Sequence, residues 1–247
     1  MIRPLEHHLA SRSVVQLPFD LQVYLTLREA GDMGPSGAER QARRDELLQE
    51  TGVDPRRFAT VRQVHSREVV ILRAGAPVPP DTEADGILTD DPERVLGVTV
   101  ADCMPIFLSA PRVGVFGALH SGWRGTGILG VALELLRTRF GAESREVSVA
   151  LGPSIGSCCY QVDEGRAALF ADQWGDRAVV RRDDGPYLDL QQANLGILER
   201  EGVETVYASR QCTSCSPELG SFRREGAAHF TRMMAFIRGD APTHASL

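Results

Sequence analysis

The sequence contains no lysine, and this absence removes two kinds of chemistry from consideration. All 27 basic residues of the 247-residue chain are arginines. Schiff-base catalysis needs a lysine amine, and a P-loop needs a lysine beside the phosphates. The sequence therefore excludes both mechanisms.

Excess basic charge and long apolar runs are also absent. The chain has 33 acidic residues against those 27 arginines, which gives a formal net charge of −6. A general nucleic-acid-binding protein would show a basic face instead. No segment approaches the roughly 20 apolar residues of a membrane span, and residues 1–20 lack the apolar run of a signal peptide. We therefore expect a cytoplasmic protein that binds neither nucleic acid nor membranes.

The chain instead alternates short apolar runs with helical patterns, and it shows no repeats and no break in composition. We expect strands or apolar elements at 94–103, 105–110, 113–120, 145–152, 203–209 and 232–239. We expect helices at 42–52, 126–141, 163–175 and 189–202. Turn-rich stretches are expected at 30–41 and 73–86, the second of them between two strand-like runs. This alternation predicts a single α/β or α+β domain over residues 1–247, which is long enough for a substantial core.

Three short polar motifs at the ends of strand-like runs each carry one residue that can bind a metal. They are RQVHS with His65, VADCMP with Cys103 and ALHSGWRG with His120. Two imidazoles and one thiolate make a three-ligand zinc site with an open fourth position. The alternative is that the histidines are structural and Cys103 fills the core. The neighbouring Asp102, the proline turn and the glycines favour the metal site, because none of them is typical of a core.

The turn after His120 is typical of an anion site. Its glycines, Gly122, Gly125 and Gly127, let backbone N–H groups face outward before a predicted helix, and Arg124 adds a forked cation. In the alternative interpretation, Thr126 caps the helix, Trp123 packs beneath the turn and Arg124 pairs with a carboxylate.

The other cysteines offer a second, weaker metal hypothesis. Cys212 and Cys215 have the C-x-x-C spacing of a zinc knuckle, which needs a second pair of ligands. The remaining cysteines, Cys158 and Cys159, are adjacent, and we expect vicinal cysteines not to point at one ion without strain. A thioredoxin-like role is disfavoured too, because the C-x-x-C does not open a helix after a first strand. We therefore interpret these residues as buried or incidental thiols.

Several motifs, taken in order, strongly resemble the YfiH-like family, often labelled multicopper polyphenol oxidase or laccase-domain proteins. The resemblance covers roughly residues 60–238 and is carried by RQVHS, ADGILTD, TVADCMPIFL, ALHSGWRGT, GPSIGSCCYQV, LDLQQAN and GSFRREG. Members of that family have been characterised as zinc-dependent purine nucleoside phosphorylases. The chain departs from the family at Thr26 and at Arg43–Arg44, where members usually carry asparagine.

The resemblance implies a fold of mixed β-sheets packed between helices. It also implies that His65, Cys103 and His120 are the zinc ligands. The implied reaction cleaves adenosine, inosine, guanosine or 5′-methylthioadenosine with phosphate, with deamination of adenosine as a side activity. We expect a monomer or weak homo-oligomer. The residues that we expect to be catalytic are Cys103, Asp102 and Arg124, and those that we expect to bind substrate are Arg124, Gly122, Gly125 and Trp123.

Three other functions stay open from the sequence. One is a copper-dependent polyphenol oxidase, since histidine and thiolate also bind copper. Several copper ions would need more ligands than six histidines supply, and His7, His8 and His244 lie in terminal segments. Another is a Cys–His hydrolase acting in peptidoglycan precursor editing, with Cys103 as nucleophile and His120 or His65 as base. The last is a non-catalytic binding module.

Overall fold

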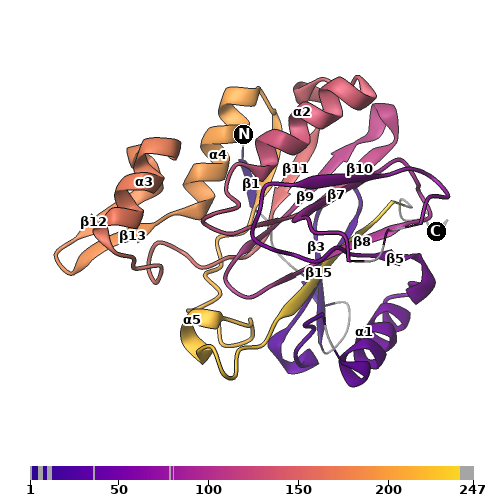
Figure 1. Ribbon diagram of the computed structural model, residues 1–247, viewed down its shortest axis with the longest axis horizontal. Coiled ribbons are helices and arrows are strands. Elements are labelled where there is room, and N and C mark those ends of the chain that lie inside the picture. The colour runs from indigo at the N-terminus through magenta and orange to yellow at the C-terminus, as the bar shows by residue number, and fades with distance from the viewer. Residues whose placement is uncertain are drawn as a thin grey trace.

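Two β-sheets lie face to face, and helices cover their outer faces (Figure 1). The larger sheet contains, in spatial order, β1 (Ile2–Pro4), β14 (Thr205–Ala208), β11 (Ser148–Leu151), β9 (Met104–Ala110), β10 (Val115–Ser121), β7 (Gly86–Thr89) and β6 (Val69–Leu72). The smaller sheet contains β2 (His8–Leu9), β3 (Val14–Leu17), β4 (Gln22–Thr26), β15 (Met233–Arg238), β8 (Val95–Val100) and β5 (Phe58–Ala59). Both sheets mix parallel and antiparallel pairs.

The computed structural model describes residues 2–4, 8–9, 13–35, 37–77, 79 and 81–239. His7, His244 and the side chain of His8, which bear on the copper alternative, lie outside this part of the chain. Within it, no helix is long and apolar enough to cross a membrane.

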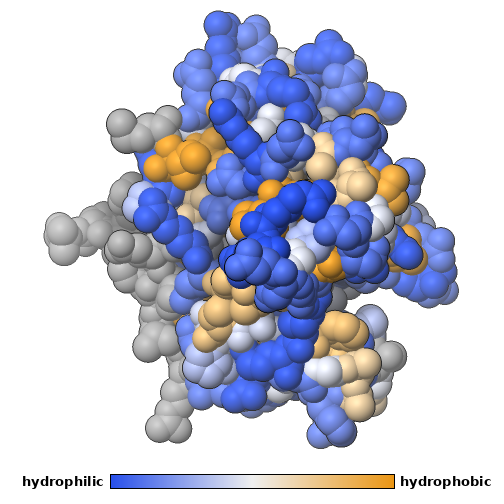
Figure 2. Space-filling view, turned by 90° about the vertical axis from the view of Figure 1, so that its left-hand side faces the viewer, coloured by the Kyte–Doolittle hydropathy of each residue, from blue (hydrophilic) through white to orange (hydrophobic). Residues whose placement is uncertain are grey.

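Helices cover the stacked sheets on both sides. The helices are α1 (Ala38–Glu50), α2 (Ile128–Phe140), α3 (Glu164–Trp174), α4 (Leu190–Glu201) and the short α5 (Phe222–Glu225), and a hairpin is formed by β12 (Val179–Arg182) and β13 (Gly185–Leu188). Helices α2 and α4 lie on the side of the larger sheet and α1 on the side of the smaller one (Figure 1). Figure 2 shows the face that carries α3 as mainly hydrophilic, with apolar residues in small separate patches.

The layers follow from the two-residue alternation of strand side chains. On β9, Phe107 packs between the two sheets, whereas Ile106 and Leu108 pack toward the helices. On β4, Leu25 packs between the sheets and Tyr24 packs toward α1. The predicted α/β class with mixed sheets between helices is therefore confirmed.

The predicted helix ends are confirmed where a capping residue marks them. Helix α2 ends at Phe140, and Gly141 caps it in the left-handed conformation with a φ of 70°. Helix α4 begins after Asp189, whose carboxylate accepts a hydrogen bond from the backbone N–H of Gln192 at 2.9 Å. These residues mark the end of α2 and the beginning of α4.

The register of three strands places the predicted site at one edge of the larger sheet. Strand β10 pairs with β9 so that Ser121 faces Met104, which brings the end of β10 beside Cys103. It also pairs with β7 so that Leu119 faces Gly86, and the backbone N–H of His120 donates to the carbonyl of Asp85 at 2.7 Å. Three loops therefore meet at this edge.

Candidate metal centre

His65, Cys103 and His120 come together although they lie far apart in the sequence. His120 belongs to β10, Cys103 lies between β8 and β9, and His65 lies in the loop between β5 and β6 rather than at a strand end. The potential ligand atoms of the three residues all lie within 4.8 Å of one another. The imidazole rings of His65 and His120 meet edge to face, with centroids 4.8 Å apart.

Asp85 organises this site, and it was not among the residues predicted from the sequence. It is fully buried, and its carboxylate lies 2.8 Å from Nδ1 of His120. The same carboxylate accepts hydrogen bonds from the backbone N–H groups of Val64, His65 and Ser66, at 3.1, 3.0 and 2.6 Å. One side chain therefore shapes the His65 loop and holds a proton on Nδ1 of His120, which leaves Nε2 free to bind a metal.

The site has the donor set and access of a zinc centre. His120 is buried, Cys103 is partly buried and His65 is exposed, so the group opens to solvent on one side. Two nitrogen donors and one thiolate within reach of one point suit Zn²⁺ with a free fourth position. The hydrogen bond from His120 to Asp85 matches the outer-shell carboxylate that commonly orients a metal-binding histidine.

Charges within the group favour a thiolate at Cys103. Burial alone would raise the pKa of this thiol, but the charge of His120 and hydrogen bonds from both imidazoles lower the pKa to about 6. Burial would lower the pKa of His120, but the Cys103 thiolate and the hydrogen bond to Asp85 raise that pKa to about 9. Each shift therefore favours the charged form of its group when no metal is bound, a thiolate at Cys103 and an imidazolium at His120.

Asp102 holds the backbone turn that directly precedes Cys103. Its backbone is held in the left-handed region, with a φ of 80°, which is uncommon for a residue other than glycine. Its carboxylate accepts hydrogen bonds from the hydroxyl of Thr213 and the backbone N–H of Arg223, both at 2.6 Å. These contacts hold the turn that leads into Cys103. The predicted catalytic role of Asp102 stays a prediction.

The glycine turn packs tightly against the three predicted ligands. A Cβ atom on Gly122 would lie 2.8 Å from Sγ of Cys103, and one on Gly125 would lie 2.9 Å from the carbonyl oxygen of Ser66. Within the part of the chain that the structure describes, the backbone N–H groups of Trp123, Arg124 and Gly125 make no hydrogen bond. Unpartnered backbone N–H groups are the donors that an anion site requires.

The alternative interpretation of this turn, in which Thr126, Arg124 and Trp123 have only structural roles, is partly wrong. Thr126 does not cap α2, because the N-cap is Gly127 and the Thr126 hydroxyl donates to the carbonyl of Gly122 at 2.8 Å. Arg124 is exposed, and among the described residues it has no carboxylate partner; its guanidinium carbon lies 5.2 Å from the Trp123 ring centroid. Trp123 does pack against the core, as that interpretation expected.

A cleft of about 190 Å³ opens beside the turn. It carries two guanidinium groups and two aromatic rings, which suit a ligand that is both anionic and planar. The lining residues are Arg67, Trp123, Arg124, Leu169, Phe170 and Gln173.

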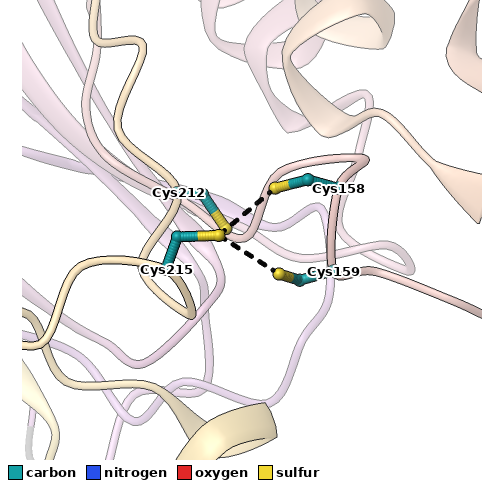
Figure 3. A group of neighbouring side chains, drawn as sticks. All are labelled: Cys158, Cys159, Cys212 and Cys215. Carbon is teal, nitrogen blue, oxygen red and sulfur yellow. Dashed lines mark hydrogen bonds between the residues drawn. The ribbon is translucent and has the colours of Figure 1, made fainter.

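The expectation that the adjacent Cys158 and Cys159 would not point toward one ion was wrong. Cys158 and Cys159 do converge with Cys212 and Cys215, and all four sulfur atoms lie within 4.8 Å of one another (Figure 3). The vicinal pair lies in a tight turn, in which the backbone N–H groups of Cys159 and Tyr160 both donate to the carbonyl of Gly156. This turn brings both sulfur atoms to one side.

Comparisons with known proteins agree on one family. The profile of a family described as multi-copper polyphenol oxidoreductase laccase matches residues 24–239. A purine nucleoside phosphorylase of Deinococcus radiodurans is 35% identical over 214 residues, which are 86% of this chain and 81% of the relative. The purine nucleoside phosphorylase YlmD of Geobacillus stearothermophilus is 38% identical over 161 residues, or 62% of this chain and 59% of the relative.

Solved structures show the same fold. The crystal structure of YlmD from Geobacillus stearothermophilus matches with a TM-score of 0.85 and 27% identity, and the match covers 95% of this chain and 99% of that one. The hypothetical protein YfiH of Bacillus licheniformis matches with a TM-score of 0.83 and 25% identity, over 94% and 98% of the two chains.

Proposed function

The chain belongs to the family described as multi-copper polyphenol oxidoreductase laccase. Because relatives of this chain are named purine nucleoside phosphorylases, we propose that it is a zinc-dependent enzyme of that kind. The observation that carries the proposal is the convergence of His65, Cys103 and His120 beside an arginine-lined cleft. The names of these relatives, at 35% and 38% identity, support the phosphorylase part of the proposal.

One metal ion suits the His65, Cys103 and His120 group. A zinc ion bound there supplies a Lewis acid that polarises an oxygen or activates water. Multicopper oxidation needs several ions, whereas this group offers three ligand atoms around one point. Copper can replace zinc on imidazole and thiolate ligands, so the proposal names zinc as the functional metal and metal analysis decides between them.

Phosphate is held by the turn between β10 and α2. Arg124 offers a forked, exposed cation, and the neighbouring backbone N–H groups are without partners in the described structure. Gly122 and Gly125 allow this backbone to approach the metal ligands closely. In the reaction, a phosphate oxygen forms a bond to C1′ of the ribose, while the bond from C1′ to the purine nitrogen breaks. The base leaves with that electron pair and takes up a proton.

The purine and its ribose occupy the adjoining cleft. Trp123 lines this cleft, and Arg166 and Arg124 lie 4.7 and 5.2 Å from its ring centroid, so both cations help to fix the indole. Adenosine, inosine, guanosine and 5′-methylthioadenosine share the purine and ribose that such a cleft accepts. Asp102 is proposed as a positioning residue, because both of its carboxylate oxygens are engaged by Thr213 and Arg223.

Deamination of adenosine uses the same site in this proposal. Water replaces the amino group at C6, and ammonia is released. This side reaction needs a purine bound with C6 near the metal ligands rather than C1′. It therefore competes with phosphorolysis for one site.

The test is to incubate the zinc-loaded protein with adenosine, with and without phosphate, and to measure adenine, inosine and ribose 1-phosphate. We expect ribose 1-phosphate to form only with phosphate and to equal the sum of adenine and hypoxanthine, because inosine made by deamination is itself cleaved. Without phosphate, we expect inosine to accumulate and no adenine to form. Adenine release that ignores phosphate would show that the protein is not a phosphorylase.

A second candidate follows from the metal-free pair. A Cys103 thiolate beside the His120 imidazolium is also the arrangement of a cysteine nucleophile with its base. This candidate is a Cys–His hydrolase. Activity that persists after complete zinc removal, and that iodoacetamide abolishes, would favour it over the zinc enzyme.

A further inference from the structure

The four remaining cysteines form a compact group outside the predicted active site. Cys158 and Cys159 lie in the loop after β11, and Cys212 and Cys215 lie in the loop after β14. Because β11 and β14 are parallel neighbours, their carboxyl ends meet at one edge of the sheet, and the two loops continue side by side. Ser154 pairs with Cys212 as an isolated bridge, and the backbone N–H of Thr213 donates to the carbonyl of Ser154 at 3.1 Å.

The separations among the sulfur atoms suit a tetrahedral ion. With Zn–S bonds of about 2.3 Å, the sulfur atoms of a tetrahedral site lie about 3.8 Å apart. Sγ of Cys215 lies 3.6 Å from that of Cys158 and 3.4 Å from that of Cys159 (Figure 3), and all four atoms lie within 4.8 Å of one another. All four cysteines are free thiols in the structure.

The local backbone is shaped around the sulfur atoms. The backbone N–H of Gly156 donates to Sγ of Cys212 at 3.2 Å, and the N–H groups of Cys215 and Ser216 donate to the Cys212 carbonyl at 3.1 and 3.0 Å. A Cβ atom on Gly156 would lie 3.2 Å from Sγ of Cys158 and 3.3 Å from Cβ of Cys212, so a side chain there would separate the two loops.

Four thiolates around one Zn²⁺ ion would carry a net charge of −2. Three nearby arginines offer positive charge that complements it. Arg224 donates to the carbonyls of Thr213 and Ser216 at 2.6 and 2.9 Å. Arg223 donates to the carbonyl of Cys159, and Arg182 to that of Ser157, both at 3.0 Å. Cationic side chains therefore hold both cysteine loops.

We propose that Cys158, Cys159, Cys212 and Cys215 bind a structural zinc ion. Four protein thiolates close the coordination sphere, so this site has no position for substrate, unlike the His65, Cys103 and His120 group. The thiols give up their protons as they bind the ion. This inference does not depend on the proposed phosphorylase activity.

A zinc ion bound by the four cysteines would hold in place two loops that contact the active site. Both cysteine loops reach Asp102, since Ile155 donates to its carbonyl at 2.9 Å, Thr213 to one carboxylate oxygen and Arg223 to the other. Asp102 directly precedes Cys103. Tying the two loops together thus fixes the turn that presents Cys103.

The test is the zinc content and zinc environment of Cys103→Ala, which leaves the four-cysteine group intact. Protein is purified under reducing conditions and analysed by mass spectrometry of metals and by X-ray absorption. We expect two zinc ions per chain in the wild type, one in Cys103→Ala and none in Cys103→Ala/Cys215→Ser. The ion left in Cys103→Ala should have four sulfur neighbours at about 2.3 Å.

Ser214→Ala is the matched control, because Ser214 lies between the two knuckle cysteines and should leave the zinc content unchanged. The proposal is overturned if folded Cys103→Ala contains no zinc while its four remaining thiols react with Ellman's reagent or are joined as disulfides. It is overturned equally if the retained zinc has nitrogen neighbours. Since Cys103→Ala alone distinguishes these outcomes, misfolding of the double variant would not obscure the result.

Discussion

At the scale of the residue, Asp85 does most to shape the His65, Cys103 and His120 group. Its buried carboxylate meets the imidazole of His120 and three consecutive backbone N–H groups around His65. The sequence does hold a signal for it, since Asp85 directly precedes the apolar run of β7 and a carboxylate buried there needs a partner inside the fold. Asp81 and Glu83 stand close by in the sequence, so this signal does not single out Asp85. The sequence alone does not identify that partner, because it lies 35 residues away on β10.

Asp85→Asn is expected to weaken zinc binding by about 10- to 100-fold, because an amide no longer offers a charged acceptor to His120 and Ser66. Zinc affinity is measured by competition with a chromophoric chelator, and the phosphorolysis rate is measured in parallel. Asp90→Asn is the matched control, since Asp90 follows the other end of β7 and pairs with Arg73 at 2.6 Å. Equal zinc affinity in both variants would contradict this role for Asp85.

Arg124→Ala is expected to raise the KM for phosphate by roughly 10- to 100-fold, the effect of losing a charge-assisted hydrogen bond. The zinc content should not change, because Arg124 is not a ligand. Steady-state kinetics at varied phosphate measure the effect. Arg137→Ala serves as control, since Arg137 is an exposed arginine of α2 that pairs with Glu134. A KM for phosphate unchanged from wild type would remove Arg124 from the anion site.

At the scale of the element, the turn from β10 into α2 joins the metal ligands to the cleft. Its sequence predicted an anion site, and the unpartnered N–H groups of Trp123, Arg124 and Gly125 in the described structure are consistent with one. The sequence did not reveal how tightly Gly122 packs on Cys103. That contact joins residues of different loops, and local pattern carries no information about it.

Gly122→Ala is expected to weaken zinc binding by roughly 10- to 100-fold. The new Cβ atom would lie 2.8 Å from Sγ of Cys103, and overpacking of this kind opposes binding by about 1–3 kcal/mol. Gly196→Ala in α4 is the control, because nothing lies within 4 Å of its Cβ position and alanine favours a helix. If both variants bind zinc like the wild type, the turn is looser than described.

At the scale of the whole molecule, the sequence predicts the helices and the central strands better than the N-terminal strands. Caps such as Asp189 and Gly141 and the apolar runs of β9 and β10 carry strong local signals. Strands β3 and β4 were not predicted, because each is short and is defined mainly by pairing, β4 with the distant β15. The convergence of Cys158 and Cys159 with Cys212 and Cys215 was missed for the same reason, since parallel pairing of β11 and β14 creates it.

Protonation of Asp85 at low pH should lower the free energy of unfolding of the metal-free protein. Burial would raise the pKa of this carboxyl, but hydrogen bonds from His120 and Ser66 lower it to about 2, against about 3.9 in an unfolded chain. A depressed pKa contributes stability above about pH 4, and this contribution, roughly 2 kcal/mol, is lost as the pH falls toward 2.

Urea unfolding of metal-free wild type and Asp85→Asn at pH 5 and 3 measures this contribution. The comparison is made between pH 5 and pH 3, because removing Asp85 also lowers the pKa of His120 and so affects the difference near neutral pH. The difference in unfolding free energy between the two proteins should shrink from pH 5 to pH 3. A difference that grows over this range would contradict the assignment.

The dependence of phosphorolysis on the metal centre is measured most directly as ribose 1-phosphate formation by wild type and Cys103→Ala, with zinc determined in the same samples. The wild type is expected to form ribose 1-phosphate from inosine and phosphate in step with hypoxanthine. Cys103→Ala is expected to lose one zinc ion per chain and this activity together. Full activity in folded Cys103→Ala would contradict the proposed function, because the reaction would then not depend on the site built by His65, Cys103 and His120.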